Sequence, residues 1–184
     1  MRIVTILLLV GSIVPGAFAH LNSYSYAEIE IGAEEIVYEL RVDVLTLVEL
    51  FQIDQNGDWI VDESEIERTR QLIYYYLRNK IKVLSGGKQL PLDLRSVEYK
   101  REPQPHVALV MRFVCPNSDE DCVMFCNVSE ETDPFHRSIS SVRIGDEEYQ
   151  FVFTKENYLT VPATLRRAAA SEEVSSATGQ PSSK

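Results

Sequence analysis

Two alternating runs near the start of the sequence decide the fold class: SYSYAEIEI, from Ser23 to Ile31, and IVYELRVDV, from Ile36 to Val44. Apolar residues recur at every second position in both runs, which is the period of a β-strand with one buried face. The residues between the runs, GAEE, read as a turn. We therefore expect a β-hairpin at the start of the folded domain.

Strand-like segments return after residue 80 and continue almost to the end of the sequence. Turn signals such as Ser85-Gly86-Gly87 and Gly145-Asp146 separate them at intervals of roughly ten residues, which is typical of antiparallel sandwiches. The predicted fold is mainly β: an antiparallel β-sandwich-like domain over residues 20–160 with a helix-loop-helix inserted at about residues 45–80. Residues 161–184 are rich in Ala and Ser, and we expect them to form a disordered tail or linker.

The insertion consists of two helical patterns on either side of an acidic loop. LTLVELFQ places Leu47, Leu50 and Phe51 on one side of a helix. ESEIERTRQLIYYYLRNK places Ile66, Ile73 and Leu77 along one stripe of another. The second helix also carries three successive tyrosines, 74 to 76, which surround one turn with aromatic surface. Core packing takes at least one of them, and the others could serve a partner surface.

The loop between the helices, IDQNGDWIVDESEI from Ile53 to Ile66, has the order of an EF-hand. Ca²⁺ prefers six to eight oxygen ligands, and a twelve-residue EF-hand loop supplies them from positions 1, 3, 5, 7, 9 and 12. Counted from Asp54, each of these positions carries an oxygen donor. The predicted calcium ligands are the side chains of Asp54, Asn56, Asp58, Asp62 and Glu65 and the backbone carbonyl of Ile60.

Trp59 departs from the EF-hand pattern, because position 6 requires positive φ and normally carries glycine. A bulky residue there costs roughly 1 kcal/mol or more, so we expect calcium to bind weakly. The four carboxylates among the predicted ligands repel one another and favour a bound cation. A single loop of this kind suggests a structural site more than a sensor, since sensor hands work by opening a groove.

An alternative interpretation needs no metal. Asn56-Gly57 can form a turn, followed by a capping box with Asp62 as the N-cap and Glu65 three residues later. This interpretation does not explain why Asp54 and Asp58 fall at ligand spacing.

Four stretches carry a resemblance to a known family: AHLNSYSYAEIEI at 19–31, FQIDQNGDWIVDESEI at 51–66, LSGGKQLPL at 84–92 and DPFHRSISSVRIGDEEYQFVFTKENYLTVP at 133–162. In their order they resemble the extracytoplasmic N-terminal domain of HupE/UreJ-type proteins, a family associated with nickel or cobalt uptake and with hydrogenase or urease maturation. Such proteins continue into membrane helices, whereas this sequence does not. The resemblance therefore implies a domain or companion subunit of a HupE/UreJ-like permease, and it does not imply transport.

The first nineteen residues have the features of a secretory signal: a cation at Arg2, an apolar run over residues 3–10, and small residues at Ala17 and Ala19. We expect cleavage after Ala19, a mature chain that begins at His20 and does not insert into the membrane, and a periplasmic or secreted location.

The formal net charge of -10 argues against nucleic acid and anionic lipid as partners. It suits a cation ligand or a basic protein partner, although ordinary solubility explains it equally well.

The mature His20 also supports an alternative function, a soluble Cu(II)- or Ni(II)-handling protein. An N-terminal histidine can chelate these ions through its α-amine and its imidazole. The simpler interpretation is that His20 merely follows the cleavage site.

The three cysteines do not have the spacing of a zinc ribbon. In an oxidising compartment a disulfide is expected, and Cys115 and Cys122 would face each other across a short hairpin turn. Cys126 is then left over, although it could take the place of either partner.

We find no catalytic motif and predict that the chain is not an enzyme. The least favoured hypothesis is a hydrolase, which would need His106 or His136 beside a nucleophile.

Overall fold

The computed structural model describes residues 24–58, 60–101, 105–115, 117 and 119–168. The expected signal peptide, His20, Trp59 and residues 169–184 lie outside the described residues. Within the described residues the labelled elements are, in chain order, β1 (Tyr24–Ile31), β2 (Glu35–Asp43), α1 (Val44–Phe51), α2 (Glu63–Lys80), β3 (Ile81–Ser85), β4 (Lys88–Gln89), β5 (Leu92–Lys100), β6 (His106–Val114), β7 (Cys122–Cys126), β8 (Arg137–Ile144), β9 (Glu147–Phe153) and β10 (Leu159–Val161). The prediction of a mainly β fold is confirmed.

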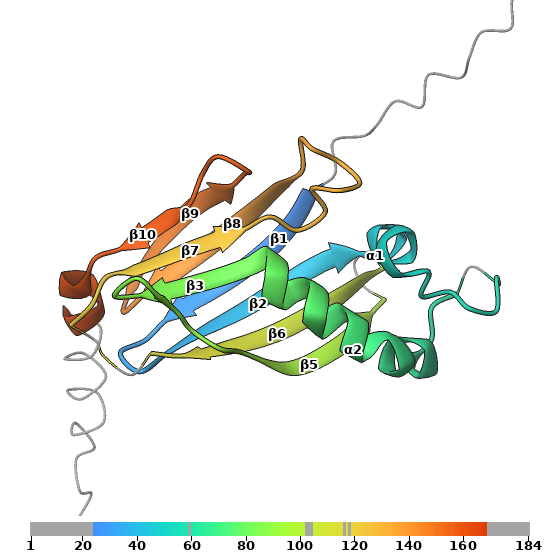
Figure 1. Cartoon of the computed structure of the whole chain (residues 1–184), viewed down its shortest axis with the longest axis horizontal. Coiled ribbons are helices and arrows are strands. Elements are labelled where there is room, and N and C mark those ends of the chain that lie inside the picture. The colour runs from blue at the N-terminus through green and yellow to red at the C-terminus, as the bar shows by residue number, and fades with distance from the viewer. Residues whose placement is uncertain (1–23, 59, 102–104, 116, 118, 169–184) are drawn as a thin grey trace, which may run out of the picture.

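The strands form two sheets, a six-stranded one in the order β5-β6-β2-β1-β8-β9 and a four-stranded one in the order β10-β7-β3-β4. Figure 1 shows the smaller sheet and α2 side by side in front of the larger sheet. The predicted hairpin is β1 and β2, with Tyr26 opposite Arg41 and Ile31 opposite Ile36. The larger sheet is nevertheless mixed, because β8 lies parallel to β1. After β6 the chain crosses to the smaller sheet as β7 and then returns to the larger sheet as β8. The two-residue period of a strand in the sequence indicates which face is buried, but it does not indicate the direction of the strand within the sheet.

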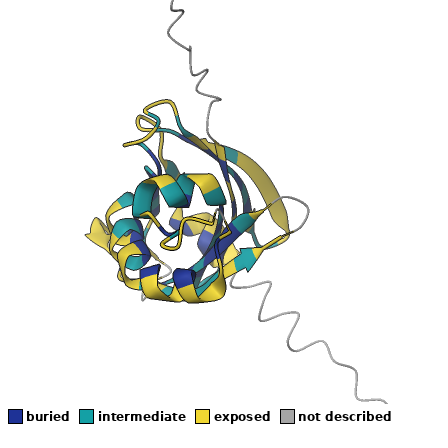
Figure 2. Ribbon diagram, turned by 90° about the vertical axis from the view of Figure 1, so that its right-hand side faces the viewer, coloured by how far each residue is buried: buried dark blue, intermediate teal, exposed yellow. Residues whose placement is uncertain are grey.

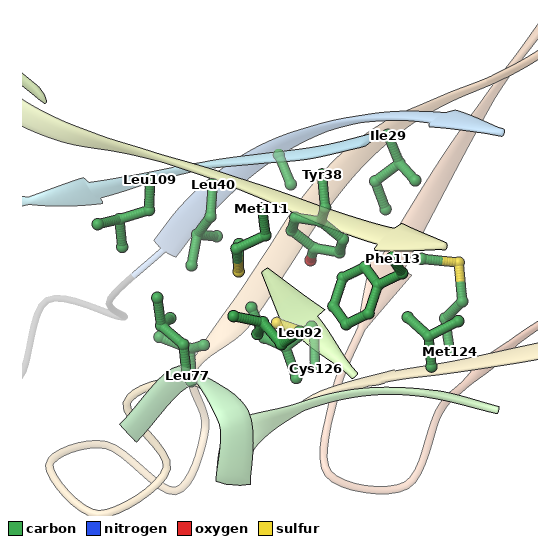
Figure 3. Close-up of a cluster of buried hydrophobic side chains, with 14 of the residues drawn as sticks. Ile29, Tyr38, Leu40, Leu77, Leu92, Leu109, Met111, Phe113, Met124 and Cys126 are labelled. Carbon is green, nitrogen blue, oxygen red and sulfur yellow. The ribbon is translucent and has the colours of Figure 1, made fainter. Parts of the chain in front are cut away.

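The core lies between the layers, as the close-up in Figure 3 shows. Tyr38, Leu40 and Phe113 from the larger sheet are at most 1% exposed, and Met124 from the smaller sheet is equally buried. α2 contributes Leu77. The view in Figure 2 shows the buried residues on the inner surfaces of the layers. The alternation in the sequence marks the buried face of β2, whereas at the start of β1 Tyr24 and Tyr26 are exposed and Ser25 is buried.

The fold extends beyond residue 160, so the predicted boundary of the tail is too early. Val161 is buried in β10, and a short helix over residues 163–168 follows it. In that helix the Arg166 side chain is 0% exposed. Its guanidinium donates hydrogen bonds to the carbonyl oxygens of Asn117 (3.1 Å), Glu120 (3.0 Å) and Ala33 (2.8 Å). These contacts connect loops that are distant in the sequence. The Ala- and Ser-rich composition of the segment did not predict them.

The expected hairpin between Cys115 and Cys122 is also absent. β6 and β7 belong to different sheets, so the connection between them crosses from one layer to the other. All three cysteines are buried free thiols in this structure, and the predicted bridge remains a prediction.

Candidate calcium loop

The loop is anchored in the core at both ends. α1 ends at Phe51, and Gln52 adopts a left-handed conformation with φ 50°, which turns the chain away from the helix. The next residue, Ile53, is 0% exposed, and Val61 on the far side of the loop is 3% exposed. Burial of these two side chains fixes the ends of the loop, while residues 55–58 and Ile60 are exposed to solvent.

Within the loop, three acceptor side chains at alternate positions organise the backbone. Asp54 Oδ1 accepts from the Gly57 amide, Asn56 Oδ1 from the Asp58 amide, and Asp58 Oδ1 from the Ile60 amide, each at 2.8 Å. Gly57 supplies the sharp bend with φ 74°, a conformation that glycine adopts freely. The three side chains expected to bind calcium at positions 1, 3 and 5 thus lie on one continuous turn.

Glu65, the expected ligand at position 12, is 2% exposed and reaches from α2 into the loop. Its Oε1 accepts from the Gln55 amide at 3.0 Å and the Asn56 amide at 3.4 Å, and its Oε2 accepts from the Asp62 amide at 3.2 Å. A buried carboxylate is costly unless it is hydrogen-bonded, and these three amides supply the bonds. The loop is therefore wrapped around this carboxylate.

Asp62 forms the N-cap of α2. Its Oδ1 accepts from the Glu65 amide at 2.9 Å, and with the return bond from Glu65 this completes a capping box. The backbone amide of Glu65 lowers the pKa of Asp62. The capping box of the metal-free interpretation is thus present, but it uses the same two residues as the calcium interpretation and does not exclude it.

The donor set fits a hard cation, since every predicted side-chain donor is a carboxylate or amide oxygen. The arrangement fits only in part. Nowhere in the described part of the chain do three or more His, Cys, Asp and Glu side chains gather as a metal-holding group. Ile60, whose backbone carbonyl is the predicted ligand at position 7, is 59% exposed. Trp59, at position 6, lies outside the described residues. To bind calcium with both oxygens, Glu65 would have to exchange its amide hydrogen bonds for the metal.

Three contacts fix the loop and its helices to each other and to the body of the protein. Arg68 on α2 donates to Gln55 Oε1 at 3.2 Å, and the rings of Phe51 on α1 and Tyr76 on α2 meet edge to face at a centroid distance of 5.2 Å. The Tyr76 hydroxyl in turn accepts from the Ser129 amide at 2.6 Å. A change in the loop can therefore reach the sheets through α2.

The structure also brings together one pair that bears on the hydrolase hypothesis: His136 Nε2 lies 3.0 Å from Ser25 Oγ. Ser25 is 0% exposed. A nucleophile must reach its substrate, so this pair is better explained as an anchor between β1 and the segment that precedes β8. His106 lines a separate hollow on the outer face of the larger sheet.

No family model matches the chain, and no curated protein matches it significantly. The resemblance to HupE/UreJ-type domains therefore stays a prediction. Among the described residues, no helix has both the length and the apolar character needed to cross a membrane.

Proposed function

We propose that this protein is a periplasmic or secreted domain that binds one calcium ion in the loop from Asp54 to Glu65, and that it acts as a structural or interaction module. A membrane protein of the HupE/UreJ type is the companion that the sequence resemblance suggests. The proposal includes no catalytic role.

The observation that supports it best is the position of Glu65. Its carboxylate is buried beneath the loop and holds three backbone amides, while Asp54, Asn56 and Asp58 hold the adjoining turn. A capping box alone needs neither Asp54 nor Asp58. Calcium would supply the positive charge that offsets the repulsion among these carboxylates.

The role of the ion would be to fix the helix pair against the sheets. Ile53 and Val61 connect the loop to the core, and Arg68 and Tyr76 extend the connection through α2. Calcium bound to the folded state stabilises it by mass action, so the melting temperature should rise with calcium concentration.

The test is calorimetric titration with CaCl₂, with melting curves in CaCl₂ and in MgCl₂. We expect dissociation constants of about 10⁻⁴ to 10⁻³ M, as in other extracellular modules. Glu65→Gln should weaken binding by more than about tenfold, because a neutral amide is a poor two-oxygen ligand, and should cost about 1–3 kcal/mol of stability without calcium.

Glu63→Gln is the matched control, since Glu63 lies in the same helical turn, is exposed and is not a predicted ligand. It should leave calcium binding almost unchanged. If 10 mM calcium alters neither the melting temperature nor the fluorescence of Trp59, the loop is an acidic turn and the proposal fails.

A further inference from the structure

The segment that begins in the helix after the loop is positively charged, whereas the whole chain is negatively charged. Residues 68–92 contain six Lys and Arg residues and no Asp or Glu, although the formal net charge is -10. The cations are Arg68, Arg70, Arg78, Lys80, Lys82 and Lys88. Such a segment gives one surface a local positive potential on an acidic protein.

Half of these cations already have partners. Arg70 lies 3.6 Å from Glu67, Lys80 forms an ion pair with Glu131, and Arg68 donates to Ser64 Oγ at 2.8 Å. In contrast, Arg78, Lys82 and Lys88 are exposed and form no ion pair among the described residues.

The unpaired cations lie at a groove whose walls combine polar and apolar side chains. A hollow of about 530 Å³ lies between the C-terminal half of α2 and the segment that leads from β4 to β5. It is lined by Tyr75, Arg78, Asn79, Lys82, Gln89, Leu90, Pro91 and Leu92, and it contains no acidic side chain. Lys88 adjoins its β4 end.

The middle tyrosine of the three on α2 has no role in the core. Tyr74 and Tyr76 are partly buried and pack against the core, whereas Tyr75 is 53% exposed, and Leu72 one turn earlier is 57% exposed. Residues three apart on a helix are neighbours on its surface, so Leu72 and Tyr75 form a small apolar strip beside the cations. Aromatic residues and arginine are enriched at protein interfaces, which have a polar rim.

We propose that this groove, formed by Tyr75, Arg78, Lys82 and Leu90 with Lys88 at its end, docks an acidic segment of a protein partner that also carries apolar side chains. The carboxylates would pair with the three free cations, and the apolar side chains would pack on Tyr75 and Leu90. A long polyanion fits less well, since the net charge of the remaining surface would repel it. The groove is separate from the calcium loop, and this inference does not depend on calcium binding.

The test uses the whole secreted chain and a short fluorescein-labelled peptide of alternating glutamate and aspartate interrupted by leucines. We expect saturable binding by fluorescence anisotropy that weakens as sodium chloride is raised. Replacing Arg78→Glu together with Lys82→Glu should weaken binding by about tenfold or more. A peptide with serine in place of leucine should also bind more weakly, because it cannot pack on Tyr75.

The control reverses the same amount of charge on another face. Arg137 and Arg143 lie on β8 and are exposed, so Arg137→Glu with Arg143→Glu should leave peptide binding almost intact. Equal loss in both double variants would overturn the proposal in favour of non-specific attraction. Binding to phosphatidylglycerol vesicles without peptide binding would assign the groove to a lipid surface, and a dimer lost only in the Arg78/Lys82 variant would assign it to a second copy of the chain; either result also overturns it.

Discussion

At the scale of single residues, one side chain of the loop, that of Glu65, accepts more backbone hydrogen bonds than Asp54, Asn56 or Asp58. Glu65 holds three amides from both sides of the loop, whereas Asp54, Asn56 and Asp58 each hold one amide nearby. The spacing of these residues could be read from the sequence. The burial of Glu65 could not, because it depends on how α2 packs against the sheets.

Trp59→Gly tests the one residue that departs from the EF-hand pattern. If position 6 adopts positive φ when calcium binds, glycine removes a penalty of roughly 1 kcal/mol, and affinity should rise about fivefold. The measurement is calorimetric titration of both proteins. Unchanged or weaker affinity would show that the indole contributes more by packing than the turn costs.

His136 should make the stability depend on pH. Burial lowers the pKa of His136, so the unfolded chain binds a proton more readily than the folded one. The stability that neutral His136 contributes to the folded state is fully present above the ordinary histidine pKa of about 6.5. This stability is lost as the pH falls from about 6.5 towards the lowered pKa of the folded state.

Melting curves between pH 7 and pH 5.5 should show this loss in the wild type and a flatter profile in His136→Gln. The same slope in both proteins would assign the pH dependence to other groups.

At the scale of elements, the sequence patterns predicted the local elements and the hairpin of β1 and β2, but not the pairing of strands distant in the sequence. The runs at 23–31 and 36–44 became β1 and β2, and the helical stripe of Ile66, Ile73 and Leu77 became the buried face of α2. The parallel pairing of β1 with β8 and the short strand β10 were missed. Periodicity reports which face of an element is buried, but which distant strand lies beside it depends on the packing of the whole chain.

The capping box at the start of α2 gives a way to separate helix capping from calcium binding. Asp62→Asn keeps a side-chain oxygen for the Glu65 amide, whereas Asp62→Ala removes it. Without calcium, we expect the alanine variant to melt a few degrees lower than wild type and the asparagine variant to melt close to it. Both should bind calcium more weakly, because each removes a charged ligand. Full calcium affinity in the alanine variant would remove Asp62 from the ligand set.

At the scale of the whole molecule, the two layers are joined at the end where β6 passes to β7. The neighbouring Cys115 thiol and the Arg166 guanidinium lower the pKa of Cys122. Arg166 itself sits inside the same loop, held by carbonyls of Asn117 and Glu120. A Cys115–Cys122 disulfide would therefore connect the two sheets. The sequence analysis predicted a hairpin within one sheet instead.

We expect exported protein to carry the Cys115–Cys122 disulfide. Oxidation removes a proton and an electron from each thiol, and the periplasmic or extracellular disulfide supply is the oxidant. Peptide mapping under non-reducing conditions should find the bridge, and Cys115→Ser with Cys122→Ser should lower stability by about 2–3 kcal/mol. Cys126→Ser is the control for the loss of a buried thiol, and three free thiols in exported protein would contradict the prediction.

The parallel pairing of β1 with β8 also has a consequence for how the chain reaches its fold. The partners in this pairing lie more than a hundred residues apart, so the larger sheet cannot be completed until most of the chain has been synthesised. Until then β1 has a hairpin partner on one edge and a row of unpaired amides and carbonyls on the other. Contacts of such long sequence separation fold slowly, on a scale of about milliseconds to seconds. During this time the unpaired edge of β1 is exposed and can pair with another chain. A chaperone that covers β1 would therefore protect the nascent chain when it is most prone to aggregate.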